Sequence, residues 1–177
     1  QDLAEAETAG ADIAFLPEYD ELYPDDYRYR VTESKLSREL EGAHRAGHFD
    51  GVLTVVMKLF GIVQPDRAYF GAKDWQQLQL VRDMAAAFFL DLEIVPCPVV
   101  REPDGLAMSS RNARLDPAER AIAPKFYRVL TSGQDEYSMK QALKNAGFEV
   151  DYVERRGDRI LGAVRLGKVR LIDNVKI

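Results

Sequence analysis

The sequence predicts an α/β protein, with a Rossmann-like parallel sheet flanked by helices and a small C-terminal α+β domain. Segments with the periodicity of strands alternate with segments of helical periodicity in the first part of the chain, which is typical of a parallel sheet. The predicted strands are 11–16, 66–70 and 91–96, and the predicted helices are 1–9, 51–64 and 75–89. Near the end, a helix at 137–145 precedes three strand-like segments at 150–154, 159–165 and 168–172, joined by turns at Gly157 and Gly167. We therefore predict one domain over residues 1–130 and a second over 131–177, made of a helix and a three-stranded antiparallel sheet.

Smaller elements follow from local signals. The segment 66–70 reads as a short buried strand, 31–33 as a short strand, and 34–41 as a short helix that Gly42 ends. Asp74 stands where the helix over 75–89 needs an N-cap. A further helix begins after Asp116, with Pro117 and Glu119 in the positions of a capping box, and Pro124 is expected to bend or break it.

Composition limits the classes of function. The chain has 177 residues and a formal net charge of −5, which disfavours nucleic-acid binding as the main function. The single cysteine, Cys97, cannot form an internal disulfide, and no Cys/His cluster has the spacing of a zinc site. No apolar stretch is long enough to span a membrane, and no signal peptide is visible. These observations favour a cytoplasmic protein without a resident metal site and without a nucleic-acid or membrane partner.

The stretch from Gly71 to Asp74 is the first candidate site. It joins the strand at 66–70 to the helix at 75–89, so Lys73 stands at a helix N-terminus, where free N–H groups attract phosphate. Gly71 has no side chain and lets a ligand approach the backbone. An ordinary strand-to-helix turn with a solvated lysine is the alternative that these residues leave open.

A second candidate lies at Ser109, Ser110, Arg111 and Asn112, whose hydroxyl, guanidinium and amide donors suit phosphate oxygens. The alternative is a hydroxyl-containing turn before the next helix. Both histidines lie in a glycine-rich loop. We interpret His44 as a solvated surface residue, whereas His48 follows Gly47 and precedes a helix, where its ring could face a ligand.

These residues belong to a longer series of motifs in which the chain resembles the pantothenate synthetase (pantoate–β-alanine ligase) family of the nucleotidylyltransferase superfamily. The matching segments cover nearly the whole chain in the right order, and the set is specific although each segment alone is weak. They are Phe15-Leu16-Pro17, Leu22-Tyr23-Pro24, Leu40-Glu41-Gly42 through Arg45, Gly47-His48-Phe49, Thr54-Val55-Val56, Lys58-Leu59-Phe60, Phe70-Gly71, Lys73-Asp74, Gln76-Gln77, the run from Asp104 to Asn112, and Arg170-Leu171-Ile172-Asp173-Asn174.

The resemblance implies a two-step reaction. ATP, with Mg²⁺, adenylates the carboxylate of pantoate and releases pyrophosphate, and β-alanine then displaces AMP from the pantoyl adenylate to give pantothenate. Small-molecule substrates and a homodimer are implied as partners. Such chemistry needs alignment and charge stabilisation rather than a protein nucleophile, which agrees with the lysine, arginine and hydroxyl groups found here.

The resemblance also implies roles for individual residues within a nucleotide- and pantoate-binding domain at 1–130. Lys73, Ser109, Ser110, Arg111 and His48 are expected to be catalytic. Gln77, Val55 and Val56 are expected to bind pantoate, with Val100 beside the adenine. The expected ATP-binding residues are Gly71, Ala72, Lys73, Asp74, Val100, Met108, Ser109, Ser110 and Arg111.

The sequence also departs from the family pattern. A Met-Gly segment, a His-x-Gly-His segment and a glutamine-bearing loop of the family are absent, and Ala72 and Ala46 stand where the family usually has Glu and Pro. We therefore expect the chain to be part of something longer, and expect residues 1–177 alone to be inactive and poorly soluble. The alternatives are a truncated, non-catalytic nucleotide-binding relative or another adenylate-forming nucleotidylyltransferase. Gln77, Val55 and Val56 count against the latter.

Overall fold

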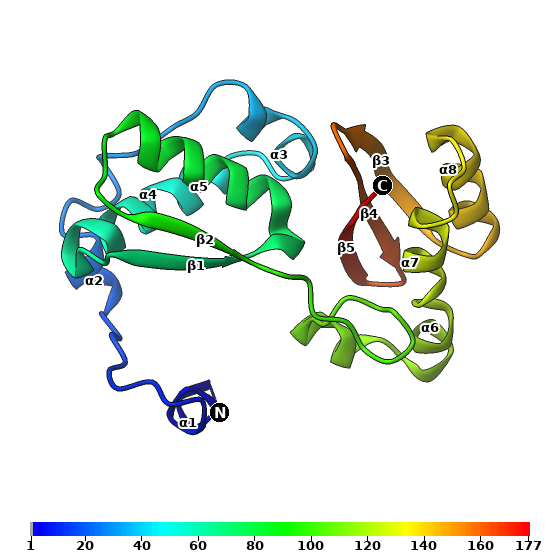
Figure 1. Ribbon diagram of the computed structural model, residues 1–177, viewed down its shortest axis with the longest axis horizontal. Coiled ribbons are helices and arrows are strands. Elements are labelled where there is room, and N and C mark those ends of the chain that lie inside the picture. Colours follow the sequence, from blue (N-terminus) through cyan, green and yellow to red (C-terminus); the bar gives the residue numbers. More distant parts are fainter. Residues whose placement is uncertain (1) are drawn as a thin grey trace.

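The computed structural model describes residues 2–177 and shows two units that lie side by side (Figure 1). The N-terminal unit contains the helices and the parallel strands of residues 2–97. Its elements are α1 (Asp2–Thr8), α2 (Tyr19–Leu22), the 3₁₀ turn η1 (Leu36–Arg38), α3 (Glu41–His44), α4 (His48–Val63), β1 (Arg67–Gly71), the 3₁₀ turn η2 (Ala72–Asp74), α5 (Trp75–Ala87) and β2 (Glu93–Cys97).

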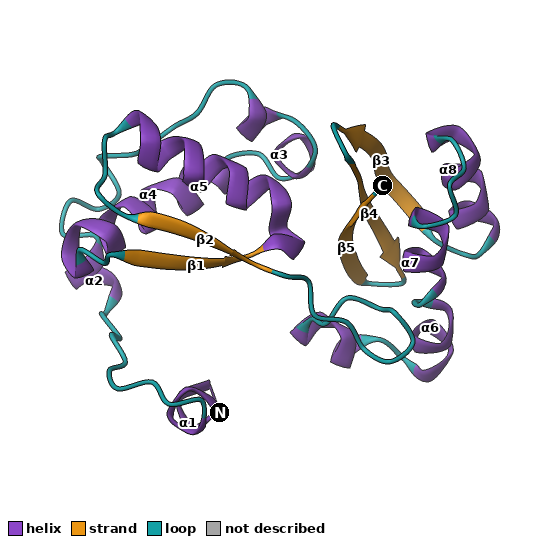
Figure 2. Cartoon of the chain, in the orientation of Figure 1, coloured by secondary structure: helices purple, strands orange, loops and turns teal. Residues whose placement is uncertain are grey.

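The C-terminal unit, residues 106–177, holds an antiparallel sheet with helices on one side (Figure 2). Its elements are the 3₁₀ turn η3 (Ser110–Arg114), α6 (Pro117–Ile122), α7 (Lys125–Leu130), α8 (Glu136–Asn145), β3 (Glu149–Arg156), β4 (Arg159–Leu166) and β5 (Val169–Lys176). The three strands are neighbours in sequence order, as predicted. Gly157 and Gly167 form the turns with positive φ angles of 59° and 55°.

In the N-terminal unit, β1 and β2 pair in parallel, with Arg67 opposite Glu93 and Gly71 opposite Cys97. Phe60 of α4 and Leu80 of α5 pack with the inward-facing side chains of this sheet. The prediction of a short buried strand at 66–70 is wrong in one respect: Ala68 and Phe70 face the core, whereas Tyr69 is 64% exposed. Pairing and alternation therefore confirm the parallel α/β arrangement, with one face of β1 open to solvent.

The predicted strand at 11–16 is not formed. These residues run as an irregular arm between α1 and α2 (Figure 1), and Ile13 is 87% exposed. A strand is stable only when its backbone groups find a ladder partner, and neither β1 nor β2 pairs with this segment within residues 2–177. Hydrophobic composition alone was therefore a misleading signal here.

Two short elements also differ from prediction. Residues 31–33 are not a strand, because the N–H of Val31 donates to Oγ1 of Thr54, at 3.0 Å, rather than to another strand. The helix expected at 34–41 is divided into η1 and α3, since Leu40 adopts a φ of 47° that interrupts the helical path. The helix expected at 51–64 begins earlier, at His48, after Gly47 with its φ of 75°.

Capping in the C-terminal unit agrees with the sequence. Asp116 and Glu119 form the predicted capping box with Pro117 in the first turn, and Pro124 separates α6 from α7. A single hydrophobic cluster joins Phe126 and Leu130 of α7 to Met139 of α8 and to the sheet. This core crosses the predicted boundary at residue 130, and the division into domains at that point stays a prediction.

Candidate functional site

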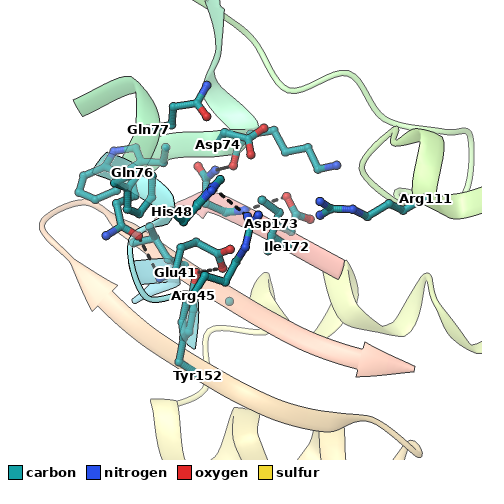
Figure 3. A pocket seen from close by; sticks show the side chains of 16 residues that line it. Glu41, Arg45, His48, Asp74, Gln76, Gln77, Arg111, Tyr152, Ile172 and Asp173 are labelled. Carbon is teal, nitrogen blue, oxygen red and sulfur yellow. Dashed lines mark hydrogen bonds between the residues drawn. The ribbon is translucent and has the colours of Figure 1, made fainter. Parts of the chain in front are cut away.

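A cleft of about 210 Å³ lies between the two units (Figure 3). The N-terminal unit contributes the ends of α3 and α4 and the turn before α5, and the C-terminal unit contributes η3 and the strands β3, β4 and β5. Its lining side chains are those of Glu41, Arg45, His48, Phe49, Lys73, Asp74, Trp75, Gln76, Gln77, Arg111, Tyr152, Leu161, Ile172, Asp173 and Asn174, together with Gly162. The carboxyl end of β1 therefore opens into this cleft, where parallel sheets bind their ligands.

Lys73 connects the two stretches that the sequence singled out. Its Nζ donates to the backbone carbonyl of Met108 at 3.0 Å, so the turn at 71–74 lies against the loop that carries Ser109, Ser110 and Arg111. Burial lowers the pKa of Lys73, while the carboxylates of Asp74 and Asp173 oppose that shift. The structure thus brings the two predicted phosphate-binding stretches together from sequence positions more than thirty residues apart.

The glycine and the cap in this turn behave differently from one another. A Cβ at Gly71 would meet no protein atom within 4 Å, so the space beside this backbone is open to a ligand. Asp74 precedes α5 as predicted, but its side chain makes no capping hydrogen bond to the helix. The predicted position of the cap is therefore correct, but the predicted capping hydrogen bond is absent. The 3₁₀ turn η2 continues directly into α5, and the Asp74 carboxylate lines the cleft instead.

The surroundings of His48 favour its neutral form. Nη1 of Arg45 lies 2.8 Å from Nε2 of His48. Because arginine has no acceptor, Nε2 must accept this hydrogen bond, which leaves the proton on Nδ1. Burial, followed by the charge of Arg45, lowers the pKa of His48. His44 is exposed, as the sequence suggested, and does not line the cleft.

The second loop is arranged by its own hydroxyl and amide groups. Oγ of Ser109 accepts from the N–H of Arg111 at 3.2 Å, the hydroxyl-containing turn that the sequence allowed. Asn112 is buried and donates from its amide to Glu102 and to the carbonyl of Ala107. The Ser110 and Arg111 side chains stay exposed, and Arg111 reaches into the cleft (Figure 3).

The expected substrate-contacting residues separate into two groups. Gln77 lines the cleft, as does Lys73. Val55 and Val56 instead pack in the hydrophobic cluster of the N-terminal unit, and Val100 is 64% exposed outside the cleft lining. The carbonyl of Val100 accepts from the N–H of Met108 at 2.9 Å, which places it beside the Lys73 partner. Ala72 contributes its backbone carbonyl, which accepts from Asn174.

Sequence reasoning gave no role to a buried polar network on the floor of the cleft. Glu41 accepts from the hydroxyl of Tyr152 at 2.9 Å and pairs with Arg170. Burial, reinforced by Glu41, raises the pKa of Tyr152, which therefore stays a donor. Gln76 is 3% exposed, and its amide bonds both the N–H of Glu41 and the carbonyl of Glu39. These residues could not be assigned from sequence spacing, because they are buried by contacts with residues far away along the chain.

An ion pair between Arg101 and Asp173 of β5, to which sequence reasoning assigned no role, lies at the side of the cleft. Arg101 grips the Asp173 carboxylate with two hydrogen bonds, at 2.6 and 2.9 Å. Burial raises the pKa of Asp173, and the Arg101 guanidinium opposes that shift. Asn174 donates from Nδ2 to the carbonyls of Ala72 and Lys73 at 2.8 and 2.9 Å. The only signal in the sequence was the pair of polar residues at the end of an apolar strand.

The charges of the cleft favour an anion. The Glu41 and Asp173 carboxylates are paired with Arg170 and Arg101. Within residues 2–177, Arg45, Lys73 and Arg111 have no carboxylate partner within ion-pair distance, and Asp74 is the remaining unpaired carboxylate of the lining. Three cations around an open space are suited to phosphate or carboxylate oxygens.

No cluster of three or more His, Cys, Asp or Glu side chains in the described part of the chain is arranged to hold a metal ion. Among residues 2–177, no helix combines the length and the apolar character needed to cross a membrane. Cys97 is a free thiol at the end of β2.

The chain is similar to known pantothenate synthetases. The chain is 55% identical over 177 residues to the pantothenate synthetase of Bdellovibrio bacteriovorus, covering the whole chain and 70% of that protein. It is 48% identical over 165 residues to the pantothenate synthetase of Legionella pneumophila, covering 93% of the chain and 66% of that protein. The chain thus spans about two thirds of the length of these relatives.

Solved structures give the same result. Pantothenate synthetase from Thermus thermophilus superposes with a TM-score of 0.87 at 40% identity, over 99% of this chain and 73% of that one. The pantoate-β-alanine ligase of Francisella tularensis, complexed with β-γ ATP and β-alanine, superposes with a TM-score of 0.90 at 36% identity, over 99% and 68%. The family model for pantoate-β-alanine ligase matches residues 1–176, and the chain therefore belongs to the pantoate-β-alanine ligase family.

Proposed function

We propose that this chain carries the catalytic cleft of an ATP-dependent ligase that condenses pantoate with β-alanine to form pantothenate. The observation that carries the proposal is the hydrogen bond from Lys73 to the carbonyl of Met108, which assembles two phosphate-binding stretches at the carboxyl end of β1. Family membership and the ATP and β-alanine complex of the Francisella relative support the same reaction.

In the first step, a carboxylate oxygen of pantoate attacks the α-phosphorus of ATP. The new O–P bond forms as the bond from the α-phosphorus to the bridging oxygen breaks, and pyrophosphate leaves with the electron pair. In this proposal Lys73 and Arg111, which line the cleft, offset the negative charge that grows on the phosphates, and the Met108 contact keeps Lys73 oriented before the reaction. Ser109 and Ser110 add donors from the same loop.

In the second step, the amine of β-alanine attacks the acyl carbon of the pantoyl adenylate. The bond from that carbon to the AMP oxygen breaks, AMP leaves, and the amine loses its proton to solvent. Gln77 lines the cleft with an amide that can hold the hydroxyls or carboxylate of pantoate. His48, neutral and with its proton on Nδ1, supplies an uncharged donor beside Arg45. Val55, Val56 and Val100 retain their proposed places beside pantoate and adenine on the strength of the family resemblance.

Mg²⁺ fits this cleft as a companion of the nucleotide. Mg²⁺ is commonly held by one or two carboxylates together with substrate phosphates, rather than by an all-protein cage. Asp74 is the exposed, unpaired carboxylate of the lining and is the residue that would hold it. When bound, the ion would supply further neutralisation of the phosphate charge. A cytoplasmic location and a homodimer are proposed from the family resemblance, and light scattering of the purified chain would test the latter.

The deciding experiment is pantoate-dependent exchange of labelled pyrophosphate into ATP by the full-length protein, followed by AMP release when β-alanine is added. Exchange that requires pantoate would support the proposed ligase. A full-length protein that binds ATP and pantoate in calorimetry but performs no exchange would instead be the non-catalytic nucleotide-binding relative. Exchange with other carboxylic acids and not with pantoate would indicate a different adenylate-forming activity.

A further inference from the structure

A second pocket, of about 220 Å³, opens beside the cleft and has an unusual lining. Its side chains are Arg45, Arg111, Arg114, Lys168, Val169 and Arg170, and we call it the basic pocket. All but Val169 carry a positive charge, and no carboxylate lines it. The chain as a whole has a net charge of −5, so this clustering is local and does not reflect a generally basic surface.

The cations come from three separate parts of the fold. Arg45 follows α3, Arg111 and Arg114 belong to η3, and Lys168 and Arg170 belong to the turn before β5 and to β5 itself. Folding therefore brings together charges that repel one another. Such an arrangement is favourable when a bound anion offsets the repulsion.

Most of these charges have no carboxylate to offset them. Within residues 2–177, Arg45, Arg111, Arg114 and Lys168 lie in no ion pair, and Arg45 is bonded to the neutral ring of His48. Arg170 pairs through Nε with Asp151 and through Nη1 with Glu41. Its Nη2 is buried and has no hydrogen-bond partner in the described part of the chain, a costly arrangement for a charged donor.

The basic pocket is continuous with the cleft. Arg45 and Arg111 line both, so the basic pocket lies directly beside the part of the cleft that holds Lys73. Its volume exceeds the roughly 30 Å³ that a water molecule occupies in the liquid, so it has room for a polyatomic anion. One guanidinium group can donate two parallel hydrogen bonds to two phosphate oxygens, which suits an anion with several such oxygens.

We propose that the basic pocket is a separate diphosphate-binding subsite, which receives the pyrophosphate released from ATP and opens a route for its exit. The assignment of pyrophosphate as the occupant rests on the proposed function. Arg114 and Lys168 are the residues particular to the subsite, because they line the basic pocket and not the cleft.

The test uses calorimetric titration of the full-length protein with inorganic pyrophosphate and, separately, with ATP, each at low and at moderate ionic strength. The variant is Arg114→Ala/Lys168→Ala, whose two side chains are exposed, so that folding should be retained and can be checked by thermal melting. The matched control is Arg82→Ala/Lys144→Ala, which removes the same charge from exposed positions outside both the cleft and the basic pocket.

We expect the pocket variant to bind pyrophosphate about tenfold more weakly or worse, because it loses two charge-assisted contacts. Its affinity for ATP should change less than threefold, and the control should match the wild type for both ligands. No pyrophosphate binding by the wild type, unchanged binding by the pocket variant, or an equal loss in the control would each overturn the subsite. Equal losses for ATP and pyrophosphate would overturn its separateness from the nucleotide site.

Failure of the proposed function has a different signature. Suppose that no carboxylic acid supports pyrophosphate exchange, while the pocket variant still binds pyrophosphate more weakly and binds ATP normally. The proposed role in product release is then overturned, and the assignment of a diphosphate-binding site is supported. If exchange is normal in the wild type but the pocket variant, which lacks Arg114 and Lys168, binds pyrophosphate as tightly as the wild type, the proposed ligase activity is supported and the subsite is overturned.

Discussion

The side-chain amide of Asn174 holds the backbone of Lys73. Nδ2 donates to the carbonyls of Lys73 and Ala72 at 2.9 and 2.8 Å, and Oδ1 accepts from Arg159 at 2.6 Å. Asn174 is 2% exposed, so its orientation is fixed from both ends. The C-terminal sheet therefore sets the position of the lysine that the N-terminal unit presents to the cleft.

Replacing Asn174 by Ala should destabilise the protein and loosen the Lys73 turn. Two part-buried carbonyls would lose this donor, a cost of about 1–3 kcal/mol in the free energy of unfolding. Chemical denaturation measures this loss, and calorimetry should show weaker ATP binding. Asn145→Ala, at an exposed site at the end of α8, is the control and should leave both quantities unchanged. An Asn174→Ala protein with wild-type stability and ATP affinity would show that the amide does not position the turn.

In the complete enzyme, Lys73→Ala should slow adenylation about 10²–10³-fold, the usual cost of removing one oriented electrostatic partner of a transition state. The readout is pantoate-dependent exchange of pyrophosphate into ATP. Lys125→Ala, which removes an exposed lysine outside the cleft, should exchange normally. Exchange within threefold of the wild type in Lys73→Ala would remove Lys73 from the catalytic residues.

Ser110→Ala and Arg111→Ala should weaken ATP binding far more than pantoate binding. Their hydroxyl and guanidinium donors lie in one exposed loop and match phosphate oxygens, whereas Gln77 lies on another element. Calorimetric titration of each ligand separates the effects. Parallel losses for ATP and pantoate would mean that the loop supports the cleft in general and does not recognise phosphate.

Gly71→Ala should leave stability nearly unchanged and weaken ATP binding. Its φ of −65° suits any residue, and a Cβ would meet no protein atom, so the free energy of unfolding should change by less than about 0.5 kcal/mol. Gly162→Ala is the informative contrast, because its Cβ would lie 2.9 Å from Cε2 of buried Phe126 and should cost about 1–3 kcal/mol. If ATP bound Gly71→Ala as tightly as the wild type, the open space beside Gly71 would not belong to the nucleotide site.

Acid should weaken the contact between His48 and Arg45. The pKa of His48 is lowered from its ordinary value of about 6.5, so between that value and the lowered one the unfolded chain binds more protons than the folded chain. The contribution of His48 to stability is therefore present above pH 6.5 and is lost as the pH falls through the folded pKa. NMR titration of the two imidazoles, assigned with His48→Gln, measures this, and a pKa at or above 6.5 for His48 would contradict the neutral ring.

The sequence predicted the elements whose signals are local. The capping box at Asp116, the break at Pro124 and the glycine turns of the C-terminal sheet all depend on residues close in the chain, and all were found. Periodicity also located α4, α5 and the parallel strands to within a few residues. The apolar segment at 11–16 failed because a strand depends on a partner, and composition says nothing about which partner is present.

The site divides in the same way. Lys73 and Arg111 could be found because charged or polar residues at strand ends and helix starts carry a recognisable meaning, and Lys73 does meet the second loop. Glu41, Gln76 and Asn174 were missed because each acts through contacts with backbone or side chains far along the chain. These polar side chains are buried and must form hydrogen bonds with other protein groups. A sequence pattern does not show which polar side chains are buried.

The separation along the chain of the contacts around the cleft has a consequence for how the protein folds. The strands β3, β4 and β5 pair through tight turns, so their ladder closes short loops and can form early. The bonds from Asn174 to Ala72 and from Arg170 to Glu41 instead close loops of 102 and 129 residues. Closing such loops costs conformational entropy before the new contacts can stabilise the structure. The cleft should therefore be the last region to become ordered during refolding, and acquisition of ATP binding should lag behind the recovery of β-sheet signal.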